Sequence, residues 1–233
     1  MPAAADRPLR ATVRRAVRWR VVLLGVCAIG VVLAATLGLA VTHRPSWYHP
    51  PAVNRARLHA DKAALAELQE EISAALNAGQ AVHFELSEDQ LNRWIAARTE
   101  MWPEAAFDVE GLEQPQINVL DGRIRVGATV RQGAFSGVLS LIGRSEVTDT
   151  SLVVYYEAAR LGAIPIPRGW IIEQLAALPP SGRGAVDVDG RGTIALKNEW
   201  VWPNGKRRFR LRELRAMSGM VSVTLEPISG ERR

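Results

Sequence analysis

The chain has 233 residues, of which 48% are hydrophobic and 23% charged, so it can bury a sizeable core and is not a disordered protein. Its net charge of +5 would suit a nucleic-acid binder, but residues 1–44 alone hold seven Arg and one Asp. The remainder has 22 basic and 23 acidic residues, so the positive charge belongs to a short tail and carries no information about the partners of the folded part.

The first predicted element is a transmembrane helix over residues 21–43. The stretch "VVLLGVCAIGVVLAATLGLAVT" has 22 residues without a charge. Such a helix would reach about 33 Å, enough to cross a hydrocarbon core of about 30 Å. Six Arg residues precede it, so the positive-inside rule predicts a basic cytoplasmic tail at residues 1–20 and an extracytoplasmic remainder, periplasmic or external. The alternative is a cleaved signal peptide, whose apolar region would be shorter, about 7–15 residues.

Two features follow from this first segment. Cys27 is the only cysteine and lies inside the apolar stretch, so no disulfide, Cys-ligated metal or thiol nucleophile is available to the remainder. Residues 44–53 contain three prolines and no hydrophobic periodicity, which predicts a stiff juxtamembrane spacer.

A long helix is predicted over residues 54–77, with Asn54 as its N-cap and Gly79 as its stop. Its apolar residues recur at helical spacing and form one stripe: Leu58, Leu65, Leu68, Ile72 and Leu76. The helix either packs on the domain or forms a dimerising stalk, and little more than two heptads favours packing.

A short strand and a second helix come next. Val82, Phe84 and Leu86 alternate with polar residues, which indicates a strand. Ser87 and Gln90 form a capping-box pattern, so a helix should begin near Glu88. The residues expected on its core side are Leu91, Trp94 and Ile95.

From about Pro115 the hydrophobic period changes to two. "QINVLDGRIRVGATV" places Asp121-Gly122 between two alternating runs, which predicts a hairpin. Two further strands follow, with turns at Gln132-Gly133 and Asp149-Thr150. "LGAIPIPRGWIIEQLAAL" then breaks the sheet pattern, because prolines cannot donate in a central strand, and predicts a helix that includes Trp170 and Ile171.

The last third is again strand-like, with a two-residue turn predicted at Asn204-Gly205. Pairing outward from this turn predicts three cross-strand pairs: Trp200 with Phe209, Trp202 with Arg207, and Glu199 with Arg210. One face of the second strand then carries three cations: Arg208, Arg210 and Arg212. This basic face is either solvated or in contact with anionic lipid headgroups or acidic envelope polymers. Nucleic acid is not an expected partner, because the predicted topology places the hairpin outside the cytoplasm.

No catalytic, cofactor-binding or metal-ligating set emerges from the remaining residues. His49, His59 and His83 lack metal-ligand spacing. "VDVDGRGTIALKNE" has acidic residues in the pattern of a calcium loop, but Asn198 stands where a bidentate Glu is required. No cofactor and no enzymatic activity are therefore expected.

The order of helices and strands predicts an α+β fold, in which residues 54–233 form one extracytoplasmic domain. Its mainly antiparallel curved sheet should be packed by two or three helices. The stretches "LSEDQLNRWI", "INVLDGRIRVGATV" and "LGAIPIPRGWIIEQL" follow a single apolar segment. This order resembles the YpmS-like family of small, anchored, largely uncharacterised bacterial proteins and, more distantly, extracytoplasmic lipid-binding domains of the TULIP kind. The resemblance implies a location at the cell membrane and this architecture.

The function expected from these features is binding of lipid or another amphiphile at the cell envelope, because a sheet packed by apolar helices can enclose a groove. The lipid bilayer would be contacted through residues 21–43. The predicted apolar ligand surface consists of seven residues: Leu86, Leu91, Trp94, Ile95, Ile164, Trp170 and Ile171. The alternative is a scaffold or assembly factor that contacts another membrane or envelope protein through the helix at residues 54–77.

Overall fold

The computed structural model describes residues 26–103, 112–133, 135–177, 186–188, 193–202 and 207–228. Its strands form two antiparallel sheets. Sheet one has the order β1-β11-β10-β9, with bounds Val82–Ser87, Met220–Pro227, Arg208–Met217 and Trp200–Val201. Sheet two has the order β2-β3-β4-β5-β8-β7, with bounds Leu112–Leu120, Arg123–Gln132, Phe135–Val147, Ser151–Leu161, Thr193–Lys197 and Val186–Val188.

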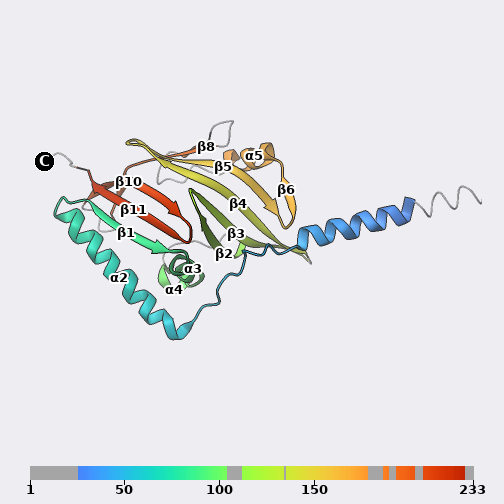
Figure 1. Cartoon of the computed structure of the whole chain (residues 1–233), viewed down its shortest axis with the longest axis horizontal. Coiled ribbons are helices and arrows are strands. Elements are labelled where there is room, and N and C mark those ends of the chain that lie inside the picture. The colour runs from blue at the N-terminus through green and yellow to red at the C-terminus, as the bar shows by residue number, and fades with distance from the viewer. Residues whose placement is uncertain are drawn as a thin grey trace, which may run out of the picture.

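The remaining elements lie around these sheets. β6, Ile164–Ile166, pairs only with β5, which suits the proline at its centre because Pro cannot donate in a ladder. The helices that follow the apolar segment are α2 (Arg55–Asn77), α3 (Glu88–Ala96), α4 (Arg98–Met101) and α5 (Arg168–Ala177). Figure 1 shows α2 running along sheet one, and α5 close to β5 and β6.

The predicted fold class is wrong in its first element. We expected a transmembrane helix at residues 21–43, whereas no helix among the described residues is long and apolar enough to cross a membrane. Residues 26–42 do form a helix, here called the apolar helix, which extends away from the domain (Figure 1). The uncharged run in the sequence predicted a full crossing, but a helix of this described length rises only about 26 Å against a hydrocarbon core of about 30 Å.

Local capping and turn signals are confirmed. The Asn54 side chain accepts a hydrogen bond from the Ala56 N–H at 3.0 Å, and the Ser87 hydroxyl accepts one from the Gln90 N–H at 3.1 Å, so both helices begin where predicted. Leu120 pairs with Arg123 across the predicted hairpin turn, where Gly122 has a φ of 66°. A positive φ is accessible to glycine without steric cost.

The register predicted for the tryptophan hairpin is also confirmed where it is described. Trp200 pairs with Phe209, and their rings stack with centroids 6.0 Å apart. The turn itself, at residues 203–206, lies outside the described residues. The main-chain N–H of Trp202 donates to the Arg207 carbonyl at 2.9 Å, so this predicted pair is confirmed as well. The Trp202 ring contacts Phe209, with ring centroids 5.8 Å apart, and its indole N–H donates to Ser73 at 2.7 Å.

The larger core cluster lies between α2 and sheet one. Ile72 and Leu76, from the end of α2, pack with Val82, Leu211 and Leu225 and are at most 8% exposed, as are these three partners. The long helix therefore covers a sheet with the stripe that its sequence predicted, which agrees with the packed alternative rather than the stalk.

Side-chain hydrogen bonds attach α3 to the edge of sheet two. The Asn92 amide donates to the Ile117 carbonyl and accepts from the Ile117 N–H, both at 2.7 Å. The Glu88 carboxylate accepts from the Val119 N–H at 2.7 Å. Because β2 is an edge strand, these bonds satisfy main-chain groups that would otherwise need water or another strand.

Candidate functional site

The chain that follows the apolar helix crosses one face of sheet two. Tyr48 is 1% exposed, and its hydroxyl donates to the Gln114 carbonyl at 2.7 Å and lies 3.0 Å from the Thr129 hydroxyl. The Trp47 ring packs against Gly127, where a Cβ atom would be 2.5 Å from the indole ring. Part of the segment predicted as a spacer is therefore packed into the domain, since aromatic burial outweighs the stiffness of its prolines.

The end of the apolar helix is held by a second contact. The Ala163 N–H donates to the Ala40 carbonyl at 2.8 Å. Beside it, Gly162 has a φ of 59°, and a Cβ atom there would lie 2.3 Å from the carbonyl oxygens of Ala40 and Val41. Only glycine allows this approach, so the base of the apolar helix is fixed against the turn between β5 and β6.

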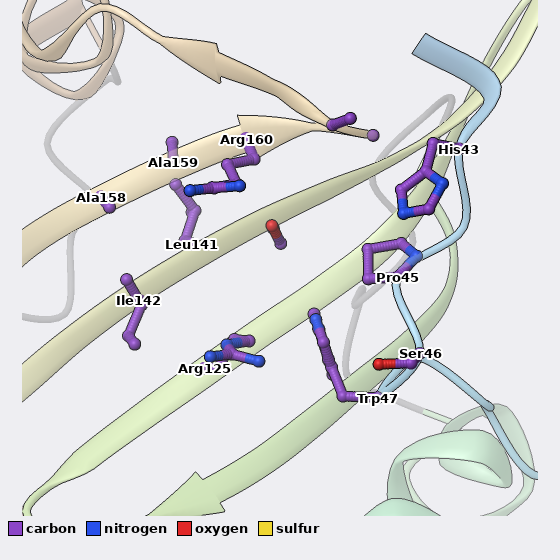
Figure 2. Close-up of a pocket in the computed structure, with 13 residues that line it drawn as sticks. His43, Pro45, Ser46, Trp47, Arg125, Leu141, Ile142, Ala158, Ala159 and Arg160 are labelled. Carbon is purple, nitrogen blue, oxygen red and sulfur yellow. The ribbon is translucent and has the colours of Figure 1, made fainter. Parts of the chain in front are cut away.

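A pocket of about 450 Å³ lies between these two contacts. Its wall is the chain from His43 to Trp47, and its floor is formed by β3, β4 and the end of β5. Figure 2 shows this arrangement, with Arg125 and Arg160 on either side of the strand that carries Leu141 and Ile142. The polar groups that line it come from six residues: His43, Ser46, Trp47, Arg125, Ser140 and Arg160. We refer to it as the basic pocket.

The two arginines of the basic pocket have no acidic partner among the described residues. Arg125 makes one contact, with its guanidinium carbon 5.1 Å from the centre of the Trp47 ring. Neither Arg125 nor Arg160 forms an ion pair within the described ranges, and Glu157, on the neighbouring stretch of β5, is engaged by Arg123 at 3.2 Å. Two uncompensated cations over a partly apolar floor suit an anionic or zwitterionic ligand.

The predicted apolar ligand surface does not come together. Leu86, Leu91, Trp94 and Ile95 lie on β1 and α3, whereas Ile164, Trp170 and Ile171 lie on β6 and α5. Trp94 and Ile171 are buried core residues at 4% and 6% exposed, and Trp170 is 52% exposed. The seven residues therefore belong to two separate places in the fold (Figure 1).

The basic face predicted on β10 is largely neutralised. Arg208 donates to the Glu199 carboxylate at 2.7 Å, and Arg210 donates to Glu226 at 3.0 Å, so the predicted pair of Glu199 with Arg210 is wrong. Arg212 is exposed. A hydrogen bond from Lys197 is the main cause that lowers the pKa of Glu199 below its ordinary value, and the charges of Lys197 and Arg208 add to it. A second pocket of about 420 Å³ lies beside these pairs. Its positive side chains are thus already paired with carboxylates of the protein.

On the opposite face of sheet two, α5 covers a small apolar cluster. Ile171 packs on Tyr156 and Ala159, all at most 8% exposed. Burial raises the pKa of the Tyr156 phenol above its ordinary value, an effect opposed by Arg168, whose guanidinium carbon lies 6.0 Å from the ring centre. This cluster supports the fold and lies behind the basic pocket, because side chains alternate between the two faces of a strand.

Comparison with known proteins adds no identification: no family model, no curated protein and no solved structure matches this chain. The resemblance to the YpmS-like family and to TULIP-like domains stays a prediction.

Sequence reasoning did not find the basic pocket. The only local signal was that Arg125 and Arg160 each alternate with small or apolar residues in a strand. The two residues are 35 positions apart, and the wall from His43 to Trp47 is further still. Their proximity depends on the pairing of β3, β4 and β5, which the strand patterns did not specify.

Proposed function

We propose that this chain is a non-enzymatic protein that attaches to a lipid bilayer through its apolar helix and binds lipid or another amphiphile at that surface. The observation that carries the proposal is the exposure of the helix. Seven of its large apolar side chains are 59% to 74% exposed: Val26, Ile29, Val31, Val32, Leu33, Leu37 and Leu39. Water is a poor environment for this surface, because burying each such side chain contributes about 1.5–3 kcal/mol.

The direction of these side chains favours lipid over a protein partner. At about 100° per residue, the seven positions point to all sides of the helix rather than along one stripe. A docking protein would cover one stripe and leave the rest in water. A lipid environment surrounds the helix completely, and the helix satisfies its own main-chain hydrogen bonds there.

An exposed aromatic residue of the domain lies beside the apolar helix. Phe135, at the turn between β3 and β4, is 66% exposed. Two residues further, Gly137 packs against the main chain of Val41 at the end of the apolar helix. Figure 1 shows this turn beside the end of the helix that meets the domain. This position supports a contact of Phe135 with the same lipid surface, into which exposed Phe side chains insert favourably.

The scaffold alternative has less support. Its candidate surface was the stripe on α2, but Ile72 and Leu76 are buried and Leu58, Leu65 and Leu68 are partly covered. An unpartnered stripe of this kind would be exposed along its length. The location of the domain outside the cytoplasm rests on the arginine-rich tail and stays a prediction.

Vesicle flotation tests the proposed attachment. The full chain is synthesised in a cell-free system with phosphatidylcholine vesicles, and we expect it to float with them. The double substitution Val32→Asp and Leu33→Asp should abolish flotation, because each charge in hydrocarbon costs about 2.5–3.5 kcal/mol. These side chains are exposed in the structure, so the domain should keep its fold.

The matched control places the same two charges on another helix. Ala64→Asp and Ala66→Asp lie at exposed positions of α2 and should leave flotation unchanged. A wild-type chain that stays soluble and fails to float, or a Val32 and Leu33 variant that floats as well as the wild type, would disprove the attachment.

A further inference from the structure

We propose that the basic pocket binds the phosphate of an anionic lipid headgroup through Arg125 and Arg160. This inference rests on the proposed function, because it takes the apolar helix to lie in the bilayer. It adds what the exposed helix does not provide, which is a site that distinguishes one class of lipid from another.

The position of the pocket fits the headgroup layer. The apolar helix ends at Thr42, and the pocket wall begins at the next residue, His43. The contacts of Ala40 with Ala163, and of Trp47 with Gly127, hold this wall on the sheet at both ends. A helix embedded in the apolar layer thus delivers the pocket to the level where phosphates begin.

The charge of the pocket fits a phosphate. Arg125 lies opposite Ile142 on β4, and Arg160 lies opposite Ser140 on the same strand. With standard strand spacings, the Cα atoms of the two arginines are roughly 12 Å apart. Two arginine side chains that extend toward each other from this distance can reach a single phosphate, which guanidinium groups bind by paired hydrogen bonds.

Trp47 restricts the side chain of one of the two arginines, Arg125. Its ring lies 5.1 Å from the Arg125 guanidinium carbon, which restricts that side chain before a ligand binds. The N–H donors of a guanidinium point outward in its own plane, so a contact of its central carbon with Trp47 leaves donors available to an oxygen ligand.

The floor and the volume fit the rest of a lipid headgroup. Ile142 and Ala158 are neighbours of the arginines on the floor of the pocket. They would present an apolar surface to the glycerol region of a bound lipid. Ser140, which is 8% exposed, and Ser46 supply hydroxyl groups that can bind ester or phosphate oxygens. About 450 Å³ lies within the range of small-molecule sites, about 300–1,000 Å³.

Other arginines of the domain are less suited to this role. Arg208 and Arg210 already bind the carboxylates of Glu199 and Glu226, and Arg131 binds Glu113 at 3.2 Å. A carboxylate partner would have to be displaced before these side chains could bind phosphate, which costs part of the gain. The basic pocket needs no such exchange.

The test is a binding titration of the full chain in micelles of a neutral maltoside detergent, read by native mass spectrometry. The probes are dioctanoyl phosphatidylglycerol, dioctanoyl phosphatidylcholine, glycerol 3-phosphate and inorganic phosphate. We expect phosphatidylglycerol to bind most tightly. The double substitution Arg125→Gln and Arg160→Gln should weaken its binding about a hundredfold or more, since two charge-assisted contacts to the phosphate are lost.

The matched control removes two other exposed positive charges, by Arg55→Gln and Arg212→Gln, and should bind phosphatidylglycerol as the wild type does. Replacing both pocket arginines by Lys should restore part of the affinity, which a purely structural role would not explain. Circular dichroism of each variant verifies that it is folded.

Three results would overturn the inference. One is equal binding of phosphatidylglycerol by the wild type and the Arg125 and Arg160 double variant. Another is equal affinity for phosphatidylcholine and phosphatidylglycerol. The third is equally tight binding of glycerol 3-phosphate or inorganic phosphate, which would assign the pocket to a soluble anion. Flotation with phosphatidylcholine vesicles does not involve these arginines, so the attachment can succeed while the headgroup site fails.

Discussion

Asn198 is a buried polar residue that links the two sheets, and it is 2% exposed. Its amide donates to the carbonyls of Thr148 and Leu211, both at 2.7 Å, and accepts from the Leu211 N–H at 2.8 Å. Thr148 belongs to the turn between β4 and β5 in sheet two, and Leu211 to β10 in sheet one, at a register shift between Leu211 and Glu213. One side chain thus satisfies main-chain groups of both sheets where the ladder is interrupted.

Removing the Asn198 amide should destabilise the protein more than removing an exposed polar side chain does. Asn198→Ala leaves the N–H and C=O of Leu211 without this partner, at about 1–3 kcal/mol for each buried group. We expect the free energy of unfolding to fall by about 2–4 kcal/mol in urea, followed by tryptophan fluorescence. Asn54→Ala, at the exposed cap of α2, is the control and should cost about 1 kcal/mol. Equal losses in both variants would contradict the bridging role.

At the scale of elements, the chain from His43 to Tyr48 behaves as part of the sheet rather than as a linker. Tyr48 is among the least exposed side chains of the described residues, and the Trp47 carbonyl accepts a hydrogen bond from the Gln116 amide at 3.3 Å. The same segment forms the wall of the basic pocket. Its packing therefore couples the apolar helix to the site that we assign to a lipid headgroup.

Gly127→Ala should disturb the packing of this segment on the sheet. The new methyl group would meet the Trp47 ring at 2.5 Å, so the ring must move and Arg125 loses its stacking partner. We expect unfolding to become easier by about 1–3 kcal/mol. Affinity for dioctanoyl phosphatidylglycerol should fall as well.

The control for this substitution is Gly169→Ala in α5, where nothing lies within 4 Å of the added Cβ. Alanine in a helix is preferred over glycine by up to about 1 kcal/mol, so this variant should be as stable as the wild type or slightly more stable. A Gly127 variant with unchanged stability and affinity would show that Trp47 does not depend on this contact.

At the scale of the whole molecule, apolar exposure is greatest at the end that carries the apolar helix. Phe135 lies beside the base of that helix, whereas Val201, 56% exposed, lies on β9 at the edge of sheet one. Figure 1 shows sheet one at the opposite end of the domain from the apolar helix. The proposed attachment thus predicts which end of the domain meets lipid.

An environment-sensitive fluorophore tests this orientation. Phe135→Cys and Val201→Cys are each made in a Cys27→Ser background, so that the label has one site. On addition of phosphatidylcholine vesicles, the label at position 135 should shift to the blue and that at position 201 should not, since only the first enters an apolar layer. A shift at position 201 alone would reverse the predicted orientation.

The sequence by itself determined the features that depend on neighbouring residues. The caps at Asn54 and Ser87, the turn at Gly122 and the pairing of Trp200 with Phe209 follow from local backbone preferences and the two-residue period of strands, so they were predictable. The transmembrane helix is the exception, because no helix among the described residues is long and apolar enough to cross a membrane.

Only the tertiary structure decided which face of each strand is covered and which residues meet. Alternation placed Ile124 and Val126 on one face of β3, and Arg125 and Gly127 on the other. Val126 is 42% exposed, while Gly127 is buried under Trp47 and Tyr48, so at this point of β3 the covered residue is not the more apolar one. A segment about 80 residues away in the chain makes that choice and closes the basic pocket, and such long-range contacts leave no periodic signal in the sequence of either partner.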